Sequence, residues 1–220
     1  MGRSTLLWVH APAHDRCMHL LLIEDRPGIA ANSAEALERA GHHVHRCHES
    51  DTKAFPCAAL TASCPLEGPQ PIDLVVDVRG GSDATATAGE AGGTCALRRD
   101  VPVLVDGRTD PFPGWSAVRR EDEDLIPACE RAVADHNRAR AANIEAEIDR
   151  MIGAGSEGSA VTFSNTQTGT SILIKVPIEV TPQIAGTLAT RVHAIERDRG
   201  AVHSVLDIAV TGIGPVPQPQ

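Results

Sequence analysis

The sequence predicts an α/β fold, a doubly wound parallel sheet, followed by a second, smaller α+β domain. Two observations predict the first domain: short apolar runs alternate with helical patterns, and three of these runs have an acidic residue at or next to their carboxyl end. A third observation predicts the second domain, because longer strand patterns follow a Gly- and Ser-rich break near residue 155. The predicted boundaries are an N-terminal extension at 1–17, a first domain at 18–135, a helical linker at 136–155, the α+β domain at 156–213 and a disordered tail at 214–220.

The first domain is predicted element by element from its apolar runs. The predicted strands are HLLLIED at 19–25, HVHRCH at 43–48, IDLVVDV at 72–78, VPVLVDG at 101–107 and a weak fifth at 116–119. The segment at 26–42 has helical spacing of its small and apolar residues, with Gly41 as a stop signal. The Cys- and Pro-rich segment at 49–71 is ambiguous. The Gly-rich stretch at 79–93 is predicted to be a loop, with a short helix at 94–100 and another helix beginning near 122.

The second domain is predicted to have the order strand, strand, helix, strand. The strands fall at 160–164, 170–180 and 201–212, and the helix at 181–200. Thr181 is the expected N-cap, Pro182 suits the first helical position, and Gly200 is the expected stop. Its topology is weakly similar to BON and alkaline-shock domains. That similarity implies a binding or self-association module, so a homodimer is one expected state.

Four carboxylates, those of Glu24, Asp25, Asp77 and Asp106, fall at the ends of predicted strands. The carboxyl ends of parallel strands meet at one edge of a sheet, where ligands bind in this architecture. Carboxylates brought together repel one another, and a hard cation such as Mg²⁺ relieves that repulsion. Glu24, Asp25 and Asp77 are therefore the candidate metal ligands, with Mg²⁺ as the candidate cofactor. Acids also occur at such ends simply because they face water.

The segments LLLIEDRPGIAANSAEALERAGHHVHRC, DLVVDVRG and VPVLVDG resemble successive strands and helices of bacterial response-regulator receiver domains. The resemblance covers 18–135 and implies a flavodoxin-like fold. It also implies that Asp77 is the phospho-acceptor, that the acidic pair helps to hold Mg²⁺, and that a histidine kinase is a partner. The Ser/Thr place after the fourth strand is instead Asp106–Gly107, and Arg119 and Arg120 are the nearest cations to the family's Lys-Pro position.

These departures favour a divergent receiver that acts as a signalling scaffold, with or without phosphorylation, coupled to an interaction domain that does not bind DNA. We expect no turnover chemistry on a small substrate. The formal charge of −9 disfavours nucleic-acid binding. The sequence has no apolar stretch of transmembrane length, so we expect a cytoplasmic protein that does not enter membranes.

A different hypothesis rests on the His- and Cys-rich region at 42–64. Its candidate ligands for a metal- or redox-sensing site are His43, His45, Cys47, Cys57 and Cys64. Imidazoles and thiolates are good Zn²⁺ ligands, and alternate residues of a strand share one face. The spacing matches no metal-finger pattern, however, so ordinary strand-edge histidines and small apolar cysteines are the competing interpretation.

Overall fold

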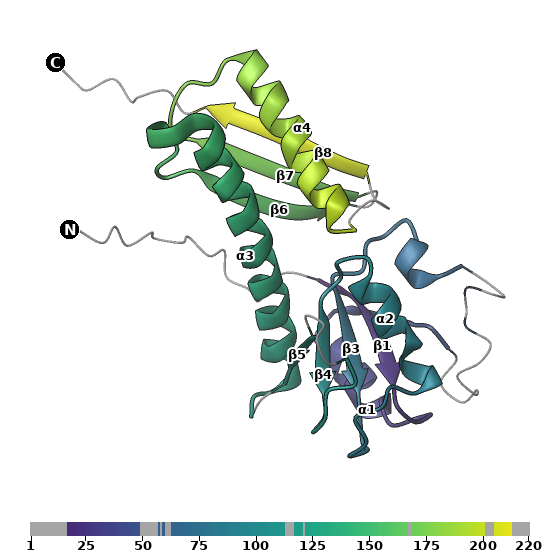
Figure 1. Ribbon diagram of the computed structural model, residues 1–220. Helices are drawn as coiled ribbons and strands as arrows, with labels where there is room; N and C mark the ends of the chain where they lie inside the picture. Colours follow the sequence, from purple (N-terminus) through teal and green to yellow (C-terminus); the bar gives the residue numbers. More distant parts are fainter. Residues whose placement is uncertain are drawn as a thin grey trace.

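The protein, described here from a computed structural model, contains two sheets joined by a long helix (Figure 1). The structure describes residues 17–48, 57, 59, 63–112, 117–120, 122–166, 169–200 and 205–212. The predicted extension before residue 17, the predicted tail and most of the Cys-rich insert lie outside the described residues.

The first sheet has five parallel strands in the order β2-β1-β3-β4-β5. The strands are β1 (His19–Glu24), β2 (His43–Arg46), β3 (Leu74–Val78), β4 (Val103–Asp106) and β5 (Ala117–Arg119). All five predicted strands are therefore present. The central strands are runs of Leu, Ile and Val because helices cover both of their faces.

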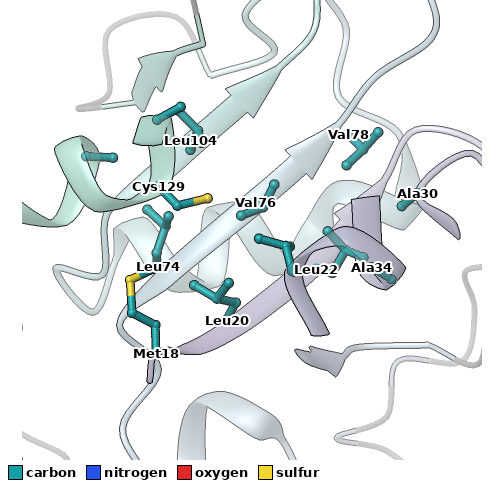
Figure 2. Close-up of a cluster of buried hydrophobic side chains, with 13 residues drawn as sticks. Met18, Leu20, Leu22, Ala30, Ala34, Leu74, Val76, Val78, Leu104 and Cys129 are labelled. Carbon is teal, nitrogen blue, oxygen red and sulfur yellow. The ribbon is translucent and has the colours of Figure 1, made fainter. Parts of the chain in front are cut away.

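Helices α1 (Ala31–Arg39) and α3 (Leu125–Ile152) cover one face of this sheet, and α2 (Ala91–Leu97) covers the other. Figure 2 shows the first core, in which Leu20, Leu22 and Val76 pack beside Ala34 of α1 and Cys129 of α3. Even-numbered β3 residues face this core, and Val75 faces the second core beneath α2. Asp77 shares the α2 side, where its carboxyl group is fully enclosed.

Helix α2 begins inside the Gly-rich stretch that was predicted to be a loop. The glycines that disfavour a helix are the residues that let this one lie close to the sheet. A Cβ on Gly92 would stand 2.8 Å from Cys47 Sγ, and one on Gly93 would stand 2.4 Å from the Phe112 ring. Close packing therefore outweighs the low helix propensity of glycine at these positions.

The second sheet has the order β6-β7-β8, with β6 (Ala160–Thr166) antiparallel and β8 (Val205–Gly212) parallel to β7 (Gly169–Val176). Helix α4 (Pro182–Asp198) lies between β7 and β8 in the chain, so the predicted strand–strand–helix–strand order is confirmed. The predicted N-cap is also present, because the Ile184 N–H donates to Thr181 Oγ1 at 3.3 Å.

The predicted helical linker is the second half of α3, which runs unbroken from the first sheet to the second (Figure 1). Ala128 and Ala132 near its start pack in the first core, and Ile144 and Ile148 pack in the core of the second sheet. None of the helices in the described ranges is both long and apolar enough to cross a membrane.

The first and second domains also contact each other at the turn where α2 ends. Asp100, in the turn between α2 and β4, accepts hydrogen bonds from Arg199 Nε at 2.8 Å and Nη2 at 3.2 Å. His136 of α3 lies beside the same carboxylate, with its Nε2 3.6 Å from Oδ2. Gly200 packs so closely on this turn that a Cβ would stand 2.6 Å from the Arg98 carbonyl oxygen.

Candidate functional site

The carboxyl edge of the first sheet carries the predicted acids, and each acid has a separate local role. Glu24 ends β1 and turns its carboxylate onto the following turn, where the Gly28 and Ala30 N–H groups each donate to it at 3.0 Å. Asp25 instead accepts from the Gly80 and Gly81 N–H groups at 3.2 and 2.9 Å. The two neighbouring acids therefore bind the backbone of two different loops.

Asp77 lies one residue before the end of β3, between Ile23 of β1 and Val105 of β4 in register. Its exposed fraction is 0%. Neither of its carboxyl oxygens accepts a hydrogen bond from an N–H group or a hydroxyl group among the residues that the structure describes. Its close partner is the carboxyl group of Glu90, which is also fully buried.

Glu90 is fixed by two further groups. The Thr87 N–H donates to Glu90 Oε2 at 2.6 Å, and Arg79 Nε lies 3.1 Å from Glu90 Oε1. The Arg79 side chain is 1% exposed, and its Nη2 also donates to the carbonyl oxygens of Asp83 and Thr85 at 2.7 and 3.2 Å. Arg79 therefore joins the buried acid pair to the loop that leads into α2.

Burial and the neighbouring Glu90 carboxylate together raise the pKa of Asp77, the Arg79 cation opposes them, and the net pKa is about 8. Because Asp77 has no donor of its own and lies beside a second buried carboxyl group, the pair is compatible only if one of the two groups carries a proton. At neutral pH the raised pKa of Asp77 leaves it protonated, so that Asp77 donates a hydrogen bond to Glu90, whose carboxylate pairs with Arg79. The three groups together have no net charge, which makes their burial tolerable.

The structure does not bring Glu24, Asp25 and Asp77 together as three ligands around one point. Within the described ranges, no three His, Cys, Asp or Glu side chains are grouped so as to hold a metal ion. Glu24 and Asp25 are instead occupied by backbone N–H groups, and Asp77 is enclosed in the sheet, although Asp25 is near enough to contribute to the raised pKa of Asp77. Mg²⁺ binding by these three residues stays a prediction.

A cavity of about 630 Å³ opens at the same edge of the sheet, beside the ends of β3, β4 and β5. Its walls are the 79–82 loop, the 106–108 loop and Arg120. Arg120 Nε lies 2.9 Å from Asp106 Oδ1, so these two side chains form an ion pair across the cavity wall. The positions at which the resemblance predicted a hydroxyl group and a lysine are therefore taken by this pair.

The predicted His/Cys site comprises two histidines on the edge strand β2 and three cysteines. His43 and His45 lie on β2 beside His19 of β1. Cys47 is buried beneath α2, and burial raises the pKa of its thiol to about 12. Cys57 and Cys64 are partly exposed, and all six cysteines are free thiols.

Sequence reasoning missed Glu90, Arg79 and His19. Arg79 follows Asp77 by two residues, directly after the end of β3, so the alternation rule could have placed it on the same side. Glu90 had no such signal, because it lies in a stretch whose composition is that of a loop. Comparisons with protein families, with curated proteins and with solved structures found no match.

Proposed function

We propose that the chain is a signalling protein whose first domain is a receiver-like module that works without aspartyl phosphorylation. The strand order β2-β1-β3-β4-β5, with helices on both faces, is that of flavodoxin-like folds and supports this assignment. The second domain is proposed to be the interaction unit, and the partner is another signalling protein or a second copy of the chain.

The burial of Asp77 carries the proposal. A phospho-acceptor must meet its phosphodonor and must attack as a carboxylate. Asp77 is fully enclosed, and its raised pKa keeps it protonated at neutral pH. The carboxyl group that the family would phosphorylate therefore has a structural role here, as the donor to Glu90.

The ends of β4 and β5 support the same proposal. A receiver reads a new phosphoryl group with a hydroxyl and a lysine, whereas this chain has the Asp106–Arg120 ion pair. The Asp106 carboxylate would repel a phosphoryl group, and Arg120 is already paired. Neither Asp106 nor Arg120 is therefore suited to bind a phosphoryl group on Asp77.

A contact between the domains offers a route for a signal. The N-terminal end of α2 follows Glu90 directly, and Asp100, in the turn after α2, accepts a hydrogen bond from Arg199, the C-cap residue of α4. A partner that shifts α2 on the sheet would therefore alter the contact with the second domain.

The test is exposure of the full-length chain to acetyl phosphate or beryllofluoride with Mg²⁺, followed by intact mass spectrometry and calorimetry. We expect no phosphoryl adduct and no binding heat above that of Asp77→Asn. A stoichiometric adduct that disappears in Asp77→Asn would overturn the proposal and restore the phosphorylation hypothesis.

The predicted alternative, redox sensing, is less well supported. Reactive cysteines have lowered pKa values and are accessible, whereas Cys47 is buried and its pKa is raised to about 12. Redox sensing by Cys57 and Cys64 stays a prediction, which thiol counting after peroxide treatment would test.

A further inference from the structure

Three histidines share one face at the β2 edge of the first sheet. His43 and His45 alternate along β2, so their side chains point to the same side. His19 lies on the adjacent strand β1, where its Cα pairs with that of His43. A His-x-His pair on one strand with a third histidine on its neighbour therefore places three imidazoles together.

The rings are close enough for a shared ligand. His19 Nδ1 and His45 Nε2 are 3.1 Å apart, and the His19 ring stacks on His43 with centroids 4.7 Å apart. Two nitrogen ligands of a tetrahedral Zn²⁺ ion, each about 2.0–2.1 Å from the metal, are roughly 3.3 Å apart. The His19–His45 nitrogen spacing therefore fits either one hydrogen bond or two ligands of one ion.

The three imidazoles are accessible. His43 is exposed, and His19 and His45 are partly exposed. A metal ion can therefore reach the cluster from solvent.

We propose that His19, His43 and His45 bind one divalent first-row transition ion, with Zn²⁺ as the candidate and water in the fourth position. His19 and His45 already have the required spacing. The three rings are not yet arranged around one point, so the exposed His43 side chain must turn to complete the site. The site uses none of the cysteines and does not depend on the proposed signalling function.

The test is titration of the untagged, full-length chain with Zn²⁺ against a chromophoric chelator, and with Co²⁺ by visible absorption. We expect one high-affinity ion per chain and the intense visible bands of tetrahedral Co²⁺. His45→Ala and His43→Ala are each expected to weaken Zn²⁺ binding by at least about 10- to 100-fold, because loss of supporting groups outside the ligand shell already costs that much.

The matched control is His193→Ala, which removes an exposed histidine from α4. It is expected to leave Zn²⁺ affinity unchanged. Absence of a one-to-one complex, or equal weakening in the control, would overturn the proposal. Retention of full affinity by His43→Ala would overturn the three-histidine site. Circular dichroism of each variant would show that the fold is intact, because the substituted side chains lie outside the buried cores.

Discussion

The buried Asp77–Glu90 pair predicts that the chain loses stability as the pH rises. In the folded chain Asp77 keeps its proton up to about pH 8, whereas an unfolded aspartate releases it near pH 3.8. Between these values the folded state binds more protons than the unfolded state. The unfolding free energy therefore decreases with rising pH across this range.

The expected size follows from the two pKa values. At about 1.36 kcal/mol per pH unit, the interval from 3.8 to about 8 corresponds to about 6 kcal/mol in total. About 2 kcal/mol of this is expected between pH 6 and pH 8, because Asp77 is already half ionised at pH 8. The total unfolding free energy of a domain is about 5–15 kcal/mol, so urea unfolding followed by circular dichroism should detect the loss readily.

Asp77→Asn tests the cause. The amide has the shape of the protonated acid and can still donate to Glu90, but it does not titrate in this range. We expect the variant to match the wild type near pH 6 and to keep that stability at pH 9. Asp122→Asn, at an exposed position, is the control and should follow the wild type. Equal loss of stability in Asp77→Asn and the wild type between pH 6 and pH 9 would refute the reasoning.

Further predictions concern buried charges and the contact between the domains. Glu90→Gln leaves Arg79 buried without its anion and should cost about 3–5 kcal/mol in urea unfolding; a loss below about 1 kcal/mol would contradict this. Gly200→Ala forces a side chain onto a backbone with φ of 96° and should cost at least about 1–3 kcal/mol. Gly186→Ala, in open space on α4, should instead raise the unfolding free energy by about 0.5–1 kcal/mol. Equal effects of Gly200→Ala and Gly186→Ala would argue against the close packing of Gly200 on the turn after α2. Burial lowers the pKa of His136 from 6.5 to about 4. The neutral ring therefore contributes fully to the unfolding free energy above pH 6.5, and this contribution is lost as the pH falls to 4. An NMR titration midpoint near 6.5 would contradict this.

The sheet could be predicted from sequence because its strands are continuous apolar runs. IDLVVDV and VPVLVDG read as buried strands whether or not their neighbours are known. A short helix was expected at 94–100, but the start of α2 at Ala91 could not be predicted, because Gly92 and Gly93 act through contacts with Cys47 and Phe112 that exist only in the folded chain.

The acid site was predicted only in part, for a related reason. Sequence position placed Glu24 and Asp77 at strand ends correctly, but position does not determine which way a carboxyl group turns. The Glu24 carboxylate accepts hydrogen bonds from the N–H groups before α1. Asp77 contacts Glu90, which lies thirteen residues later in the chain. Such pairing depends on tertiary packing, which local patterns do not encode.

Helix α3 also has a mechanical consequence. Its 28 residues, at about 1.5 Å each, form a rod of about 42 Å that is embedded at both ends. A tilt of about 5° at the end packed on the first sheet would displace the other end by roughly 4 Å, for a rigid rod of that length. The helix therefore acts as a lever arm, which converts a small rearrangement under one sheet into a displacement of the other.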